Sequence, residues 1–401
     1  MSQKNKIYLD SNAGAPLLPL VREKLKALLD HPSLANPSSI HSDGRVAKKL
    51  LLDARESIAQ SIFKNQNSSD QIVLTSSGTE ANQTVIQSVL TEAFVTKKRP
   101  HWITSAVEHD SVMQMREWFE AQGGIVTLVG VDLKGSVNLK SLENEIIPES
   151  TALVSLVWVN NETGVVSPVE EVSKITKQNK IPLHLDGAQA WGKIELNYNE
   201  LSPDYLTFSS HKIGAPAGVG IIALGKNVKF APLIFGKQEK GRRGGTENLF
   251  GIVGAGVAAS TLNPKLYEES ISPKREYLEQ LLARLIEGVK INGMGSQRVC
   301  NTLNLSFEGV HGDGLVMALD LAGYCVSSGS ACSSGALEPS HVLMAMGLSK
   351  KEAMAAVRVS LNYDISLQDI DHFVENLATI VNRIRNAASK RPVSQTEQNV
   401  F

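Results

Sequence analysis

Short apolar runs alternate with amphipathic segments along most of the chain. The runs are rich in β-branched residues, which is typical of buried strands. They predict strands at residues 7–10, 71–75, 101–105, 125–131, 151–159, 183–186, 205–208 and 219–224. Apolar residues at helical spacing predict helices at 20–30, 46–62, 113–121 and 172–178. Strands that alternate with helices in this way favour an α/β fold.

The pattern changes from about Leu262. Residues 273–289 are predicted as a charged amphipathic helix and 313–320 as another helix. Residues 301–307 alternate as a half-buried strand does, and 357–361 form a strand that contains an arginine. A chain of 401 residues is too long for one ordinary core, so two domains are expected.

The composition is that of an ordinary globular protein and argues against several classes of partner. Apolar residues make up 42%, charged residues 20%, and the formal net charge is −1, so no nucleic-acid or membrane partner is indicated. The N-terminus has no apolar leader, and the apolar run 250–259 is short and glycine-rich, as in a close-packed helix. Three cysteines favour reduced thiols in the cytoplasm, and no Cys/His spacing suits a metal. Residues 390–401 are predicted to be disordered.

The strand 205–208 leads into Ser209, Ser210, His211 and Lys212, and glycines follow at once. A lysine in a tight turn at a strand end is partly desolvated, which lowers its pKa and makes the amine nucleophilic. The alternative is a surface turn lysine. Asp186 ends the preceding apolar strand, one crossover earlier. A lysine facing an aldehyde and a buried aspartate facing a pyridinium nitrogen are the two anchors of a pyridoxal phosphate enzyme.

Two further strand ends lead into helices. Residues 76–82, which include Gly78 and Thr79, combine small residues with a helix N-terminus, so they can bind a phosphate or form a plain N-cap. His109 follows the strand 101–105. It can stack on a flat cofactor and move protons, or it is a solvated residue at the start of a helix.

Several polar loops carry candidate ligands. Asn36 lies in a loop that is either a linker or a ligand for a substrate carboxylate, and Asn161 lies in a turn that is either structural or part of a site. Residues 235–248 form a basic loop that is either solvated or closes over an anion, with contact to a second subunit. Arg358, flanked by valines, suits bidentate carboxylate binding.

The cysteines differ in context. Cys332 lies among small polar residues, where a reactive thiol is expected, whereas Cys325 lies in an apolar run typical of a core.

These features together resemble the cysteine desulfurases, pyridoxal phosphate enzymes of fold type I. The similarity covers roughly residues 7–365 and rests on the shared order of its motifs. The motifs are Asn-Pro-Ser-Ser-Ile-His at 36–41, Thr-Ser-Ser-Gly-Thr-Glu-Ala-Asn at 75–82, Val-Asn-Asn-Glu-Thr-Gly at 159–164, Asp-Gly-Ala-Gln at 186–189, Ser-Ser-His-Lys at 209–212, Gly-Thr-Glu-Asn at 245–248, Ser-Ser-Gly-Ser-Ala-Cys at 327–332 and Leu-Glu-Pro-Ser-His-Val-Leu at 337–343.

The resemblance implies a role for each candidate. Lys212 would bond to the cofactor aldehyde, Asp186 would keep the pyridinium nitrogen protonated, and Cys332 would take sulfur from the substrate as a persulfide. The cofactor would contact Gln189 at its phenolic oxygen, His109 on its ring, and Gly78, Thr79, Ser209, His211 and a partner subunit's Thr246 at its phosphate. The substrate carboxylate would bind Arg358, Asn36 and Asn161.

The resemblance also implies an architecture. A large domain, residues 16–261, would hold a mainly parallel seven-stranded sheet, and a smaller α/β domain would comprise residues 1–15 and 262–389. The enzyme would be a homodimer that acts on L-cysteine and passes sulfur to an iron–sulfur scaffold or a thiolation factor. The sequence departs from the family pattern at residues 13–15, 217, 236–240 and 362–363, which bears on loop closure and partner docking.

L-Cysteine desulfurase is therefore the expected function. The alternatives are a selenocysteine lyase or another aminotransferase-type enzyme on the same fold, and a non-catalytic scaffold that retains the fold. Cys332 argues against an aminotransferase, and the complete set of candidate catalytic residues argues against a scaffold.

Overall fold

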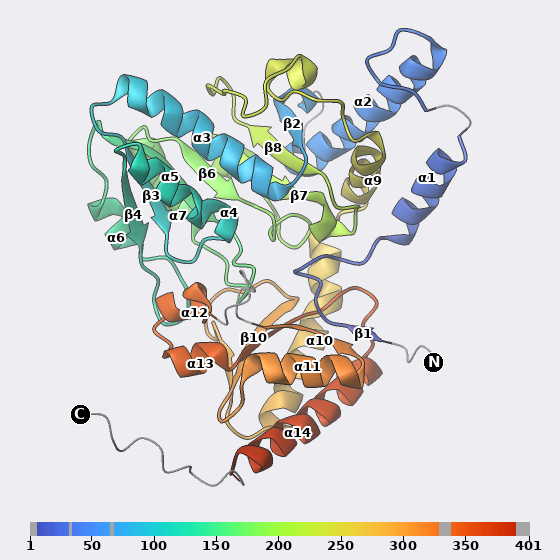
Figure 1. Ribbon diagram of the computed structural model, residues 1–401, viewed down its shortest axis with the longest axis vertical. Coiled ribbons are helices and arrows are strands. Elements are labelled where there is room, and N and C mark those ends of the chain that lie inside the picture. The colour runs from blue at the N-terminus through green and yellow to red at the C-terminus, as the bar shows by residue number, and fades with distance from the viewer. Residues whose placement is uncertain (1–5, 32–33, 65–67, 329–337, 390–401) are drawn as a thin grey trace, which may run out of the picture.

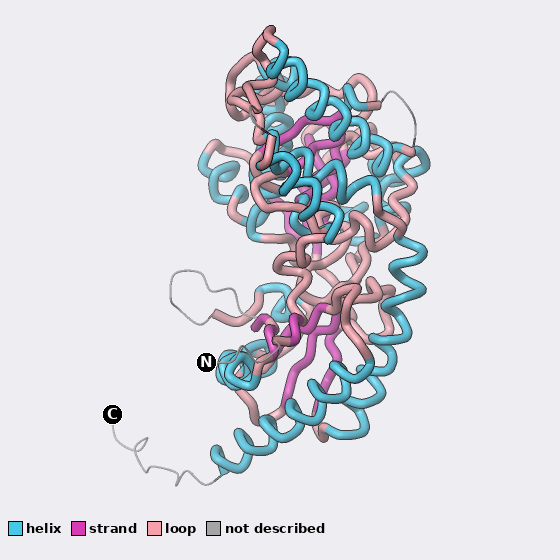
Figure 2. The backbone as a smooth tube through the Cα atoms, turned by 90° about the vertical axis from the view of Figure 1, so that its right-hand side faces the viewer, coloured by secondary structure: helices cyan, strands magenta, loops and turns pink. Residues whose placement is uncertain are grey.

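The computed structural model describes residues 6–31, 34–64, 68–328 and 338–389. It has a larger part around a seven-stranded sheet and a smaller part around a four-stranded sheet (Figure 1). Figure 2 shows the two groups of strands one above the other, with long helices along one side of the smaller sheet.

The seven-stranded sheet confirms the predicted α/β fold. Its order is β2-β8-β7-β6-β5-β3-β4, and β8 alone runs antiparallel to its neighbours. The strands are β2 (Ile72–Thr75), β3 (His101–Ser105), β4 (Ile125–Val129), β5 (Thr151–Val157), β6 (Leu183–Asp186), β7 (Tyr205–Ser209) and β8 (Gly220–Leu224). Because β3 to β7 are parallel, their carboxyl ends meet at one edge of the sheet.

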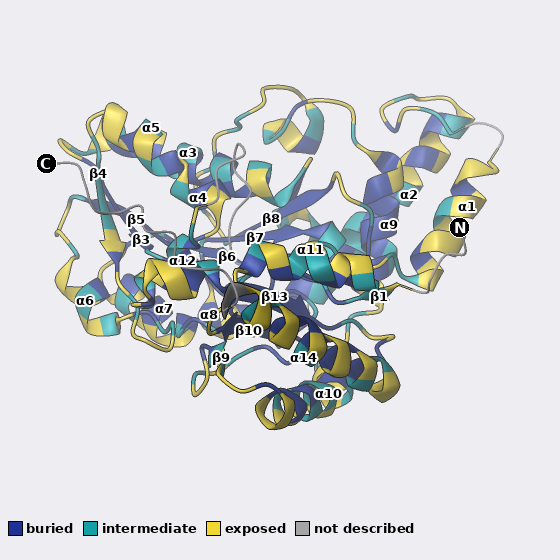
Figure 3. Cartoon of the chain, turned by 60° about the horizontal axis from the view of Figure 1, so that its bottom comes forward, coloured by how far each residue is buried: buried dark blue, intermediate teal, exposed yellow. Residues whose placement is uncertain are grey.

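Helices cover both faces of this sheet, so its central strands are buried throughout (Figure 3). Side chains alternate between the faces. Val73 and Ile222 pack against α3 (Gly78–Thr96), whereas Leu74 and Ile221 face a core shared with α2 (Ser42–Phe63) and α9 (Leu249–Ser260). The remaining helices of this part are α1 (Pro19–Leu29), α4 (Asp110–Met113), α5 (Met115–Ala121), α6 (Leu139–Asn144), α7 (Val169–Gln178) and α8 (Tyr198–Leu201).

The smaller part has its own core. The antiparallel sheet β12-β13-β10-β9 packs against helices, and β1 pairs in parallel with β11. Its elements are β1 (Ile7–Tyr8), α10 (Pro264–Leu285), β9 (Val289–Asn292), β10 (Thr302–Phe307), α11 (Gly312–Ala322), β11 (Tyr324–Cys325), β12 (Ser327–Ser328), α12 (His341–Ala345), α13 (Lys350–Met354), β13 (Ala356–Ser360) and α14 (Leu367–Ser389). Leu9 packs in this core, which supports the predicted division at residues 16 and 262; the boundaries themselves stay a prediction.

Two differences between the predicted elements and the structure have a clear physical cause. The helix predicted at 273–289 runs instead from Pro264, after the N-cap Asn263, to Leu285, so Pro273 lies inside it and Val289 begins β9. A proline removes one helical hydrogen bond, but Ile271 and Leu278 are buried on either side of it and keep the helix continuous. The strand at 301–307 is buried on both faces instead of one, because α10 and α14 cover it in addition to the contacts with the larger part.

Among the described residues, none of the helices combines the length and the apolar character needed to cross a membrane.

Candidate active site

The carboxyl ends of the strands surround a cavity of about 340 Å³. Most of the predicted site residues line it. They are Gly78, Thr79, His109, Asn161, Asp186, Gln189, Ser209, His211, Lys212 and Arg358. Asn36 and Thr246 are exposed and are not among the lining residues, and Cys332 lies outside the described residues. The fold therefore brings together ten predicted site residues from distant segments of the chain, whereas Asn36 and Thr246 lie away from the cavity.

Lys212 lies in a single 3-10 turn, Ser210–Ile213, directly after β7. Gly214 ends this turn at a φ of 79°, a conformation that suits glycine. The Lys212 Nζ donates hydrogen bonds to the backbone oxygens of Asn12, at 2.6 Å, and Ala13, at 2.9 Å. Burial, assisted by the positive charge of Arg358, lowers the pKa of Lys212 to about 8. The amine is therefore closer to its nucleophilic form at neutral pH than an exposed lysine, as predicted.

Asp186 ends β6 and is buried. Its Oδ2 accepts a hydrogen bond from the Asn82 Nδ2 at 2.7 Å, and its Oδ1 accepts one from the backbone N–H of Ala188 at 2.9 Å. The Asn82 amide is held in turn by the hydroxyl of Thr207. The Asp186 carboxylate is thus fixed in the cavity wall in a single orientation. Asn82, which holds it there, is not predicted as a site residue from the sequence.

The N-terminus of α3, where an anion site is predicted, lies at the wall of the cavity. Ser77 is the N-cap, and its side chain accepts the backbone N–H of Glu80. Ser77, Gly78 and Thr79 line the cavity, so the start of the helix borders it. A β-carbon at Gly78 would lie 3.0 Å from the Ser209 β-carbon, so any larger residue would be tightly packed there and Ser209 would have to shift. The Ser209 hydroxyl contacts the His211 Nδ1 at 2.9 Å, and burial lowers the pKa of His211 to about 4. These are neutral hydrogen-bonding groups around a helix N-terminus, the chemistry that binds phosphate.

His109 is the N-cap of α4. Its Nδ1 accepts the backbone N–H of Ser111 at 3.1 Å, so in the neutral ring the proton resides on Nε2. His109 borders the cavity beside Asp186. The ring is therefore held by its local backbone with one nitrogen available to a ligand.

Arg358, at the centre of β13, is 8% exposed. Its Nη2 pairs with the Asp10 carboxylate at 2.7 Å, and its Nη1 donates to the backbone oxygen of Asn161 at 3.1 Å. Its buried Nε has no hydrogen-bond partner among the described residues. The guanidinium is thus held by the Asp10 carboxylate and the Asn161 carbonyl, and Arg358 also lines the cavity. A guanidinium in this position is suited to bind a carboxylate ligand.

A second cavity, of about 460 Å³, adjoins the first and shares His109, Asn161 and Arg358 with it. Its wall includes Ser327 and Ser328, where the described chain stops, and Glu338, Pro339 and Ser340, where it resumes. Both described flanks of the segment that contains Cys332 therefore border the candidate site.

The loop predicted to close over an anion is anchored to the anion site. Arg243 donates from its Nε to the Glu80 carboxylate at 2.9 Å, and Glu239 is paired with Arg55 and accepts the backbone N–H of Leu74. Thr246 follows these anchors and is exposed. Its side chain is therefore accessible to a second subunit.

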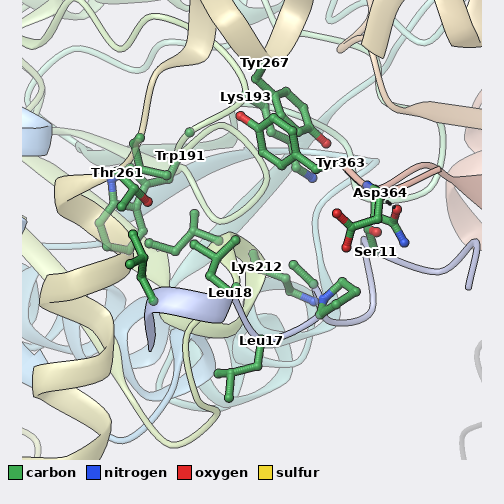
Figure 4. Close-up of a pocket in the computed structure, with 18 of the residues that line it drawn as sticks. Ser11, Leu17, Leu18, Trp191, Lys193, Lys212, Thr261, Tyr267, Tyr363 and Asp364 are labelled. Atoms are coloured by element: carbon green, nitrogen blue, oxygen red, sulfur yellow. Dashed lines mark hydrogen bonds between the residues drawn. The ribbon is translucent and has the colours of Figure 1, made fainter. Parts of the chain in front are cut away.

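A third cavity, of about 440 Å³, lies on the other side of Lys212 (Figure 4). Its lining is mainly apolar and includes Leu17, Leu18 and Trp191, with Lys193 next to Tyr267 and Tyr363. Within the described part of the chain, no group of three or more His, Cys, Asp or Glu residues is placed to hold a metal ion.

The residues of the first cavity fit pyridoxal phosphate. The helix N-terminus, Ser209 and His211 match a phosphate, the fixed carboxylate of Asp186 matches a pyridinium nitrogen, and the amine of Lys212 matches an aldehyde. The close packing of Gly78 on Ser209 is an independent sign that the wall of this cavity is closely shaped.

Comparisons with known proteins agree with this geometry. The aminotransferase class-V model matches residues 7–373. A cysteine desulfurase of Nostoc sp. is 40% identical over 94% of each chain, and the cysteine desulfurase IscS of Dictyoglomus turgidum is 38% identical over 95% of this chain and 96% of its own. A structure described as a NifS-like protein superposes with a TM-score of 0.86 at 32% identity, over 94% of this chain and 100% of its own. A structure of SspA in complex with cysteine superposes with a TM-score of 0.77 at 31% identity, over 88% and 98%.

The match extends through both sheets and includes every strand end that contributes to the cavity. Members of this family use pyridoxal phosphate, in agreement with the residues that line the site. The chain belongs to the aminotransferase class-V family, within its group of cysteine desulfurases of fold type I.

Proposed function

We propose that this protein is an L-cysteine desulfurase, which converts L-cysteine to L-alanine and leaves the sulfur as a persulfide on Cys332. The observation that carries the proposal is the convergence of Lys212, Asp186 and Arg358 on one cavity, while both described flanks of the Cys332 segment line the adjoining cavity. The named relatives, and the solved structure of SspA with cysteine, support the choice of substrate.

Pyridoxal phosphate, when bound, supplies an aldehyde for an amine and a ring that withdraws electrons from the substrate Cα. Asp186 holds a proton at the ring nitrogen, and the first amides of α3 with Ser209 and His211 bind the phosphate. Arg358 and Asn161 bind the substrate carboxylate, while the Lys212 amine moves a proton at the substrate Cα. Asn36, which caps its own turn by accepting the Ser38 N–H, is proposed to join them from its exposed loop.

The sulfur transfer balances without an added oxidant or reductant. The Cys332 thiolate bonds to the substrate sulfur while the substrate Cβ–S bond breaks, and Cβ takes up a proton to give alanine. Cys332 then holds the extra sulfur atom for an acceptor protein, an iron–sulfur scaffold or a thiolation factor. The proposal includes a cytoplasmic homodimer in which Thr246 reaches the partner's phosphate site; the exposure of Thr246 supports this.

The function is tested by incubating purified protein with L-cysteine and a thiol reductant and measuring sulfide and alanine together. Equal amounts of both products are expected. Release of pyruvate in place of alanine, or transfer of the amino group to a keto acid, would contradict the proposal. Parallel reactions with selenocysteine determine which of the two substrates the site prefers.

Replacing Arg358 by alanine is expected to raise the KM for cysteine more than it lowers cofactor affinity. A charge-assisted contact is worth about 2–4 kcal/mol, so the KM should rise by more than about tenfold. Arg298→Ala is the matched control, because the side chain of Arg298 is also buried and is paired with a glutamate at 2.7 Å, but does not border the active cavity. An unchanged KM in Arg358→Ala would remove Arg358 from the substrate site.

Replacing Asp186 by asparagine is expected to leave the cofactor bound and to slow turnover by on the order of 10²-fold, because a neutral amide does not stabilise a protonated ring nitrogen. Turnover and the exchange of the substrate Cα proton with solvent deuterium report the effect. Asp204→Asn, at a carboxylate that accepts the backbone N–H of Leu183 away from the cavity, is the control. Near-normal exchange in Asp186→Asn would show that Asp186 is only structural.

A further inference from the structure

The geometry points to Lys193 as a positioning residue, which orients the Gln189 amide so that its N–H group faces the cofactor. This inference rests on the proposed contact between Gln189 and the phenolic oxygen of pyridoxal phosphate. Lys193 lies outside all the motifs on which the resemblance to the cysteine desulfurases rests. Its side chain is nevertheless almost fully buried, at 6% exposed, next to a residue of the active cavity.

Three hydrogen bonds define the arrangement. The Lys193 Nζ donates to the Gln189 Oε1 at 2.5 Å and to the Asn12 Oδ1 at 2.9 Å. The Gln189 Nε2 donates to the backbone oxygen of Asn12 at 2.9 Å. Each end of the Gln189 amide therefore has its own partner, and both partners are fixed in the interior.

These contacts permit only one orientation of the amide. A flipped amide would place its N–H groups against the N–H groups of Lys193, and its oxygen against the Asn12 carbonyl. That carbonyl also accepts from the Lys212 Nζ at 2.6 Å. In the observed orientation the second N–H of the Gln189 Nε2 remains for a ligand of the cavity that Gln189 and Lys212 line together.

Lys193 acts from behind the site. It lines the third cavity, beside the edge-to-face pair Tyr267 and Tyr363, and is not among the residues that line the active cavity (Figure 4). Burial lowers the pKa of Lys193 to about 7, with the charges of Lys212 and Arg358 acting in the same direction. An amine has two N–H donors and an ammonium has three, so both protonation states can make the two observed bonds.

Asn12 connects the hydrogen bonds around Gln189 to the substrate side of the cavity. The Asn12 Nδ2 donates to the Thr302 Oγ1 at 2.9 Å and to the backbone oxygen of Asn161 at 3.1 Å. The latter oxygen also accepts from Arg358. Lys193 thus supports the wall that joins the cofactor side of the cavity to its substrate side.

A double-mutant cycle tests the inference without using activity. Lys193→Met, Gln189→Leu and the double variant are prepared with cofactor, and two quantities are measured: the Kd for pyridoxal phosphate and the midpoint of the pH titration of the visible absorbance of the bound cofactor. Each single variant is expected to raise the Kd by about tenfold and to move the midpoint upward, since the phenolic oxygen loses a donor. The double variant should match Gln189→Leu, because Lys193 acts through Gln189.

Lys177→Met, at an exposed lysine of α7, is the control and should change neither quantity. If Lys193→Met does not fold, Lys193→Leu, which also lacks an N–H donor, replaces it in the same cycle. A Lys193 variant with wild-type Kd and midpoint, or effects that add in the double variant, would overturn the inference. A Gln189→Leu variant with wild-type Kd and midpoint would overturn both this inference and the proposed contact between Gln189 and the cofactor. The desulfurase function itself is tested independently, by the formation of sulfide and alanine from L-cysteine.

Discussion

Replacing Cys332 by serine is expected to abolish sulfide release from L-cysteine, by more than about a hundredfold, while cofactor binding is unchanged. The attacking group is a thiolate, and a serine hydroxyl does not replace it at neutral pH. Cysteine should still alter the visible absorbance of the bound cofactor in this variant, because the residues that bind the cofactor and the substrate carboxylate are intact. Mass spectrometry of the wild-type protein after cysteine treatment should find the extra sulfur on Cys332.

The described structure supports this choice of cysteine. Cys332 is four residues beyond Ser328, which lines the cavity that adjoins the active cavity, and four residues of chain reach at most about 14 Å. Cys300 is buried, and burial raises its pKa to about 11, which suppresses the thiolate. Cys325 is half-buried in β11, where it pairs with Tyr8.

Cys300→Ser and Cys325→Ser are therefore the matched controls and should remain active. A free thiol with a pKa of about 8.5 is only a few per cent thiolate at pH 7. Wild-type activity should therefore rise as the pH increases from 7 towards about 8.5. Sulfide release by Cys332→Ser at the wild-type rate would mean that the desulfurase mechanism is wrong and that a lyase mechanism replaces it.

Replacing Lys212 by alanine is expected to remove the covalent attachment of the cofactor and to lower turnover by on the order of 10²–10⁴-fold, the usual contribution of an acid–base group. Borohydride treatment followed by peptide mapping should find the reduced cofactor on Lys212 in the wild type. The same treatment of Lys212→Ala should find no cofactor on any lysine. Full labelling of another lysine, such as the neighbouring Lys193, would show that the assignment is wrong.

The lowered pKa of Lys212 adds a pH dependence to this prediction. The neutral amine is the reactive form, and it predominates only above the folded-state pKa of about 8. Attachment of cofactor to the apoprotein should therefore accelerate as the pH rises towards 8 and level off above it. An exposed lysine, with a pKa near 10.4, would still be accelerating at pH 9.5, so the two profiles are distinguishable.

The sequence alone determined the strands of the larger sheet. It also determined that Asp186 ends one of these strands and that Lys212 directly follows another. Strand and helix periodicity are local properties, and a polar residue at the end of a buried parallel strand faces a shared edge whatever the details of packing. The order of the motifs identified the family for the same reason, because each motif is a short contiguous segment.

The tertiary structure alone decided how those residues are held. Asn12, Asn82 and Lys193 have no local signal of a role, since their partners are up to 290 residues away in the chain. The pairing of Arg358 with Asp10 likewise joins β13 to the segment after β1. Pro273 appeared to begin a helix and is inside one, because the buried faces on both sides of it outweigh one lost hydrogen bond. Periodicity reports which face of an element is buried, but only the assembled fold decides which side chains meet there.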